Sequence, residues 1–292
     1  MKDHLVKATA EGVRVYAAVT TDLVNEAIRR HDCYPVAAAA LGRTMTGALL
    51  MAANLKDADG AITIKFQGGG PLGTVTADAS PQGYVRGYVD NPHVNLPLNS
   101  LGKIDVSGGV GKDGLVTVTR FTGLKNPVSG SCEITDGEIA DDLTKYLYVS
   151  EQTPSSVGLG VLVDKEFHCI GAGGFIIQPL PDVEDSVIDR LEQNLATVHS
   201  VSHMVEHGFD AKQIIETLLT GFDVNYLSTT DLAFRCNCSK SHIATVLASL
   251  QSNDLQQLID DGHAEVCCHF CNEKYQFDKD DLLAIQMLAQ RK

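Results

Sequence analysis

The sequence predicts an α+β fold, in which a mainly antiparallel sheet core packs with helices and is followed by a helical linker and a small C-terminal four-cysteine module. Short alternating runs separated by glycine-rich turns dominate positions 1–180. Two prolines and an acidic cluster interrupt the chain at 179–186, and helical periodicity follows. Five of the eight cysteines then fall between positions 236 and 271. We therefore expect a core at 1–180, a linker at 181–230 and a cysteine module at 231–292.

The core is expected to contain two early helices and a sheet. A Thr-Thr-Asp capping run opens a helix at Thr21–Arg30, and a second helix, Val36–Leu55, follows Pro35. Alternating runs then predict strands, and apolar residues at helical spacing predict one more helix at Glu138–Val149. The expected strands are Ala61–Phe66, Gly73–Ala77, Tyr84–Val89, Leu115–Thr119, Val157–Val163 and Cys169–Ile177.

The linker is expected to be amphipathic. Apolar residues recur at three-to-four spacing from Val187 to Val205, which predicts one helix that ends at Gly208. A second helix should run from Asp210, a good N-cap, to Gly221. Residues 181–230 contain nine acidic and two basic side chains. Such a segment should be only marginally stable without partners.

Length and composition indicate a folded chain of more than one part. The 292 residues suit two domains, and 44% hydrophobic with 21% charged residues is ordinary usage for globular proteins. The longest apolar candidate for a membrane span, Pro35–Leu50, is interrupted by Gly42 and Arg43. The N-terminus has no apolar signal region. We expect a cytoplasmic protein that does not bind membranes.

Charge and cysteine usage restrict the partners further. A net charge of -14 repels phosphate backbones, so nucleic acid is not expected as a partner. Eight cysteines in a cytoplasmic chain would be kept reduced, which favours metal or redox chemistry over structural disulfides.

The cysteine cluster predicts a zinc site. Cys236 and Cys238 form a Cys-x-Cys pair, Cys268 and Cys271 form a Cys-x-x-Cys pair, and positions 239–267 separate the two pairs. Two pairs of thiols can complete a closed tetrahedral shell, and zinc is the natural metal for four thiolates. We expect one Zn²⁺ per chain in the reduced form, with two short helices between the pairs. The metal should supply much of the folding energy of so small a module.

The remaining cysteines leave one alternative open. Cys267 could replace Cys268 by pairing with Cys271 across three residues, although a two-residue spacer is more common at zinc sites. Cys33, Cys132 and Cys169 have no ligand spacing and are expected in the core.

Other motifs match by letter only. His263-Ala-Glu265 before the Cys-x-x-Cys pair lacks the proline and spacing of a zinc deaminase, so both residues are expected at the surface. Gly109–Gly114 matches a dinucleotide fingerprint but precedes a strand. His199, His203 and His207 recur every four residues and include an inverted zinc-protease motif, for which a solvated histidine face is the preferred interpretation. No catalytic constellation stands out, and we do not expect an enzyme.

Two functions from other classes compete for the cysteine module. One is a zinc-ribbon interaction module that docks a partner while the core does something unrelated. The other is a thiol oxidoreductase using Cys268 and Cys271, although the thioredoxin-like βαβ context expected for it is missing from the flanking sequence.

Several pieces along the chain resemble one known family. Beside the two cysteine pairs, signature-like segments occur at Gly42–Met45, Gly69–Gly73, Ser150–Ser155, Ala172–Gln178 and Val266–Cys271. Over the whole chain they resemble the redox-regulated heat-shock chaperone family, also called the thirty-three-kilodalton chaperonins.

The resemblance implies a fold and a function. It implies a folded core, a helical linker and a zinc-binding redox-switch domain, and an ATP-independent holdase for unfolding proteins under oxidative stress. It places the zinc ligands on Cys236, Cys238, Cys268 and Cys271. It further implies disulfides Cys236–Cys238 and Cys268–Cys271 after oxidation, zinc release with unfolding of the module and linker, and a homodimer on activation. The additional Cys267 departs from the family pattern.

Overall fold

The structure is a computed structural model that describes residues 2–123, 126–198 and 200–289. Contacts between residues divide it into two compact units, Met1–Arg235 and Cys236–Lys292. The segment expected as a linker lies within the first unit, because its helices and one strand pack on the sheet of the core. The second unit begins at Cys236, shortly after the expected start of the cysteine module at 231. The α+β class with antiparallel sheets is confirmed.

One sheet of the first unit has five strands in the order β10-β1-β2-β9-β8, with antiparallel neighbours throughout. β1 and β2 form a hairpin whose two turn residues, Glu11 and Gly12, both have positive φ, as two-residue hairpin turns favour. The sequence pattern does not indicate β10, because this edge strand is exposed and lacks apolar alternation. The strands are β1 (His4–Ala10), β2 (Val13–Val19), β8 (Ser156–Val163), β9 (Cys169–Pro179) and β10 (Asn225–Asp231).

The other sheet of this unit has six strands in the order β11-β5-β4-β3-β6-β7, antiparallel except between β11 and β5. On β3 the buried residues Ile62, Ile64 and Phe66 alternate with half-exposed ones, so one face of the strand is in the core. The four strands expected between 61 and 119 are confirmed. The strands are β3 (Ala61–Gln67), β4 (Thr74–Ala79), β5 (Tyr84–Val89), β6 (Leu115–Phe121), β7 (Val128–Glu133) and β11 (Ala233–Phe234).

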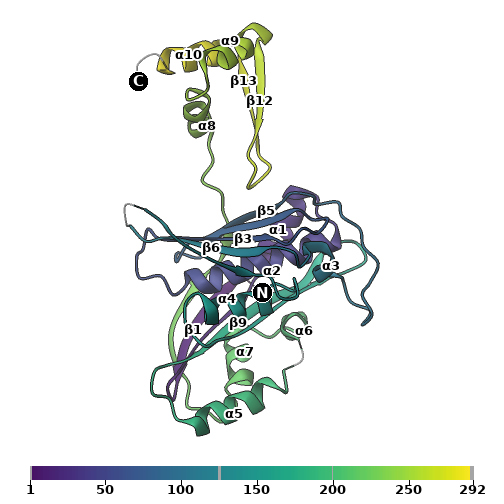
Figure 1. Cartoon of the computed structure of the whole chain (residues 1–292), viewed down its shortest axis with the longest axis vertical. Helices are drawn as coiled ribbons and strands as arrows, with labels where there is room; N and C mark the ends of the chain where they lie inside the picture. Colours follow the sequence, from purple (N-terminus) through teal and green to yellow (C-terminus); the bar gives the residue numbers. More distant parts are fainter. Residues whose placement is uncertain (1, 124–125, 199, 290–292) are drawn as a thin grey trace. The chain divides into compact units, whose positions relative to one another are not determined.

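Helix α2 (Pro35–Ala52) lies between the two sheets, with contacts to β3, β4 and β5 on one side and to β8 and β9 on the other (Figure 1). Its length and a mean hydropathy of 1.2 would suit a membrane span, but 89% of it is buried inside the protein. Its apolar surface is therefore used by the core. The other helices of this layer are α1 (Thr21–His31), α3 (Val106–Val110) and α4 (Ala140–Val149).

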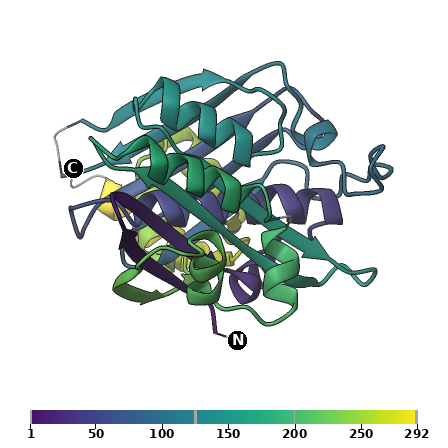
Figure 2. The same ribbon diagram turned by 90° about the horizontal axis from the view of Figure 1, so that it is seen from below.

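The linker helices cover the opposite face of the five-stranded sheet (Figure 2). They are α5 (Asp185–Leu195), α6 (Val201–Glu206) and α7 (Ala211–Leu218). Their apolar residues form a second core with outward side chains of β1, β2 and β9. The buried linker residues in this core are Val187, Leu191, Val201, Val205, Ala211, Ile214, Ile215, Leu218 and Leu219.

The expectation of one helix from Val187 to Gly208 is wrong, because the chain forms α5 and α6 instead. Ser200 has an extended backbone, and its hydroxyl accepts the N–H of His203, so it caps α6. The apolar stripe nevertheless continues across the break. Asp210 caps α7 as expected, since its carboxylate accepts the N–H of Gln213 at 2.8 Å.

The second unit has a small core of its own. A two-stranded antiparallel sheet, β12 (His263–Cys267) and β13 (Lys274–Asp278), packs with α8 (Lys240–Leu247), α9 (Ser252–Asp261) and α10 (Lys279–Ala289). The two helices expected between the cysteine pairs are confirmed as α8 and α9. The buried apolar residues are Leu247, Ala248, Leu255, Ile259, Ala264, Phe277, Leu282 and Ile285.

Candidate metal centre

An extended segment and a turn of the second unit present the four thiols. Cys236 and Cys238 lie in the extended segment before α8, which starts at the cap Ser239. Cys268 and Cys271 lie in the turn that joins β12 to β13. The N–H of Cys268 donates to the carbonyl of Glu273 at 2.8 Å, which closes this turn. The strand pair thereby fixes one half of the site.

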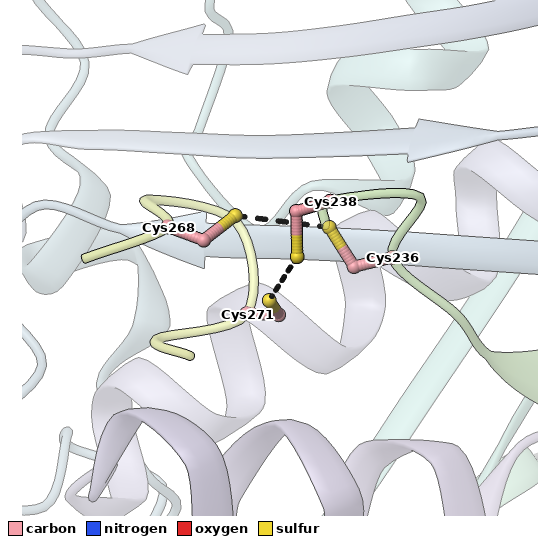
Figure 3. Close-up of side chains that lie close together, drawn as sticks. All are labelled: Cys236, Cys238, Cys268 and Cys271. Atoms are coloured by element: carbon pink, nitrogen blue, oxygen red, sulfur yellow. Dashed lines mark hydrogen bonds between the residues drawn. The ribbon is translucent and has the colours of Figure 1, made fainter. Parts of the chain in front are cut away.

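The four sulfurs form one compact group (Figure 3). All lie within 4.8 Å of one another, with 3.8 Å between the Sγ atoms of Cys236 and Cys268 and 3.3 Å between those of Cys238 and Cys271. A tetrahedral zinc site with Zn–S bonds of about 2.3 Å places its sulfurs about 3.8 Å apart. The donor set and its spacing therefore fit a bound metal ion.

Burial determines what charge this group can hold by itself. Cys271 is 2% exposed, and the other three cysteines are half-buried. Burial raises the pKa of the Cys238 and Cys271 thiols. Tyr275 donates its hydroxyl hydrogen to Cys238 Sγ at 3.1 Å, and this bond raises the tyrosine pKa. Four thiolates would therefore need a compensating cation, which a divalent metal provides.

The structure brings Cys268, and not Cys267, into this group. Cys267 is the last residue of β12, its side chain is exposed, and its Sγ lies 2.9 Å from Asn272 Oδ1. Asn272 has a φ of 57°, a left-handed conformation that asparagine tolerates in tight turns. Tyr275 is a contact of the site that no spacing rule indicates.

The other cysteines and motifs lie as expected. Cys33, Cys132 and Cys169 are buried in the first unit, and burial raises the pKa of Cys33 and of Cys169 to about 12. They are inert core residues. His263 and Glu265 are exposed on β12, as predicted.

The glycine and histidine motifs also lie in the kinds of structure that the sequence predicts. Gly109 and Val110 are the last residues of α3, and 111–114 lead directly into β6, as the expected strand requires. His203 and His207 are exposed on and just after α6, whereas His199 lies outside the described residues.

Comparisons with known proteins agree on one family. The sequence profile described as "Hsp33 protein" matches residues 3–278. A protein named 33 kDa chaperonin from Geobacillus sp. (strain WCH70) is 48% identical over the full length of both chains. Its namesake from Bacillus pumilus (strain SAFR-032) is 49% identical over 96% of this chain and 97% of the relative.

A solved structure extends the likeness to the fold. The crystal structure of a 33 kDa chaperonin from Thermotoga maritima, a heat shock protein 33 homologue, has a TM-score of 0.91 and 31% identity, and covers 99% of each chain. The chain therefore belongs to the Hsp33 family of 33 kDa chaperonins, which are chaperones rather than enzymes.

Proposed function

We propose that this chaperone is a redox-regulated, ATP-independent holdase that binds unfolding proteins under oxidative stress. The observation that carries the proposal is the apolar sheet face beneath the linker helices. In the strand register, Val6 lies opposite Ala17 and Ala8 opposite Val15, and Ile177 extends the same row onto β9. This contiguous face offers the kind of surface that unfolded clients also expose, so binding needs no nucleotide.

Cys236, Cys238, Cys268 and Cys271 are the proposed ligands of one Zn²⁺ in the reduced form. When bound, the ion would hold the four sulfurs as thiolates, the species that peroxide or hypochlorite attacks. Two thiolates then lose two electrons to hydrogen peroxide, which takes up two protons and becomes two waters, while one S–S bond forms. The proposed pairs are Cys236–Cys238 and Cys268–Cys271.

Loss of the thiolates removes the support of the second unit. Its apolar core is a small cluster of side chains around one hairpin. Zinc binding in comparable modules contributes on the order of 10 to 16 kcal/mol to folding. We propose that the module then unfolds and releases the metal. The functional division into core at 1–180, linker at 181–230 and switch domain at 231–292 is part of this proposal.

The linker is built so that it can detach from the sheet once the second unit has unfolded. Polar side chains of β1 and of the turn after it contact the linker. Glu11 pairs with Arg190 of α5 and accepts the N–H of Asp223 at 3.2 Å. His4 Nε2 lies 3.3 Å from the backbone nitrogen of Ala211. These contacts are exposed or half-buried and therefore weak. Its nine acidic and two basic side chains add repulsion to the folded linker. Detachment would uncover the sheet face.

Partners and location complete the proposal. Clients are unfolded or partly unfolded proteins of the cytoplasm, and activation is accompanied by homodimer formation. The net charge of -14 favours neither nucleic acid nor an anionic membrane surface.

Light scattering of a chemically denatured client, mixed with reduced or peroxide-treated chain, tests the function. The oxidised chain should suppress aggregation and the zinc-loaded reduced chain should not. Hydrogen exchange on the same samples should show protection lost from about residue 181 onward and kept before it. Equal suppression by both forms, or a linker that stays protected after zinc release, would contradict the switch.

A further inference from the structure

Two histidines, one on α6 and one directly after it, lie on the side away from the sheet. Val201 and Val205 are buried against the sheet, whereas the side chains of His203 and His207 are 59% and 72% exposed. Residues four apart lie one above the other on a helical turn. Both rings border one surface hollow, together with Val198, Met204, Phe209 and other residues.

Hydrogen bonds determine which ring nitrogens are available. His203 Nδ1 lies 2.9 Å from Glu206 Oε2, and His207 Nδ1 lies 2.7 Å from the carbonyl oxygen of His203. A carboxylate and a carbonyl oxygen only accept, so each Nδ1 carries the hydrogen. In the neutral rings each Nε2 is then left with its lone pair. Among residues 2–123, 126–198 and 200–289, neither Nε2 has a hydrogen-bond or ion-pair partner.

The sheet holds this helix closely. A Cβ at Gly171 would lie 2.4 Å from the carbonyl oxygen of Ser202, and one at Gly160 would lie 2.7 Å from its backbone nitrogen. Glycines at these positions therefore allow the backbone of α6 to rest directly on β8 and β9. While α6 is docked, the sheet and the two Nδ1 hydrogen bonds hold the imidazoles in place. A preorganised pair binds a ligand with less loss of entropy.

We propose that His203 and His207 form a second metal site, which binds a divalent transition-metal ion such as Zn²⁺ through both Nε2 atoms. Imidazole suits zinc, copper and nickel, and solvent completes the coordination. Glu206 orients the His203 ring through Nδ1, the position of the carboxylate in carboxylate–histidine–metal arrangements. His207 follows the last residue of α6, where the helix dipole favours a cation.

Metal binding at this site stabilises the state in which the linker helices are docked on the five-stranded sheet. The two rings are one turn apart only while α6 is helical, so the ion binds the folded linker in preference to the unfolded one. By mass action such an ion shifts the equilibrium toward the docked linker. The site is independent of the four thiols, because it lies wholly in the first unit.

Calorimetric titration of the full reduced chain, already loaded with one equivalent of zinc, with further Zn²⁺ tests the site. A second, weaker equivalent should bind, and it should slow hydrogen exchange in residues 201–206. H203Q and H207Q should each abolish it, and E206Q should weaken it about 10- to 100-fold, as outer-shell substitutions do.

Two variants serve as matched controls. His263 is an exposed histidine of the second unit whose Nδ1 also faces a backbone carbonyl, and Cys267 is the exposed thiol. The second equivalent should persist in both H263Q and C267S. Absence of a second equivalent, or its retention in H203Q and H207Q, would overturn the site. Failure of the four-thiol centre would instead appear before the titration, as a reduced chain that retains no tightly bound first equivalent of zinc.

Discussion

At the residue scale, neighbours in the chain differ sharply in chemistry. Cys267 and Cys268 are adjacent, yet alternation along β12 and the turn after it expose the first and direct the second to the thiol group. Asp3 shows the same effect of position at the other end of the chain. It is 2% exposed, and its carboxylate accepts the N–H groups of Asp22 and Leu23 at the start of α1.

Substitution of the two adjacent cysteines, one at a time, should show which of them is a metal ligand. Cys268→Ser removes one of four clustered sulfurs and should lose the metal, whereas Cys267→Ser should keep about one zinc per chain. Elemental analysis of the reduced, desalted proteins measures this. The opposite pattern would show that the ligand register is shifted by one residue.

Asp3 should make stability depend on pH in a narrow window. Burial raises its pKa from 3.8 to about 6, so between these values the folded chain binds more protons than the unfolded chain. Its contribution to stability is therefore present below about pH 4 and is lost as pH rises through 6. The change is on the order of 3 kcal/mol, because each pKa unit corresponds to about 1.4 kcal/mol.

Asp3→Asn isolates this contribution. The difference in unfolding free energy between the native chain and the variant, from urea titrations at pH 4 to 7, should follow that window. Coulombic neighbours Asp22 and His4 are present in both proteins and largely cancel. A difference that is constant with pH would show that Asp3 has an ordinary pKa.

At the element scale, the linker helices combine low intrinsic stability with extensive apolar contact. α7 buries Ile214, Ile215 and Leu218 completely, and α5 buries Val187 and Leu191. The docked linker thus depends on the sheet for its structure, since helices as short as α5, α6 and α7 are marginal in water.

Ile214→Ala should loosen this docking without touching a cysteine. Truncation of a fully buried isoleucine costs about 2 to 5 kcal/mol. Hydrogen exchange in 185–219 should accelerate, and the reduced chain should begin to suppress client aggregation. Leu227→Ala, on exposed β10, is the control and should change neither. Faster exchange without suppression would mean that clients bind another surface.

At the scale of the whole molecule, the described residues form three hydrophobic cores of unequal size. The first unit has a large core between its sheets and another under the linker, whereas the second unit has the small core around α8, α9 and α10. A core as small as that of the second unit supplies little stability by itself.

Truncation should show which of these cores can fold without the others. A fragment of residues 1–235 should unfold cooperatively in the presence of a chelator. A fragment ending at Pro179 should also fold, because it keeps every buried residue of the core around α2 except Leu232. It should bind a hydrophobic dye through the uncovered face of β1 and β2. Thermal melts and dye fluorescence measure both. A shorter fragment that does not fold cooperatively would mean that the linker completes the core.

The sequence by itself determined the elements whose evidence is local. The alternation of β3 to β6, the capping residue Asp210 and the paired spacing of Cys236, Cys238, Cys268 and Cys271 can all be recognised in short windows, because periodicity, capping and chelate-like spacing depend on near neighbours. The apolar stripe of the linker could equally be recognised from the sequence, but the sheet face that it packs against could not.

Only the tertiary structure decided what that stripe covers. β10 pairs with β1 although the two strands lie near opposite ends of the first unit's sequence, and the linker helices lie on a face composed of strands from both of those ends. The tertiary structure also placed the break at Ser200 and chose Cys268 over Cys267. Such features depend on which sequence-distant surfaces pack together. The free energy of that packing comes from apolar area buried between distant segments, which a short stretch of sequence does not reveal.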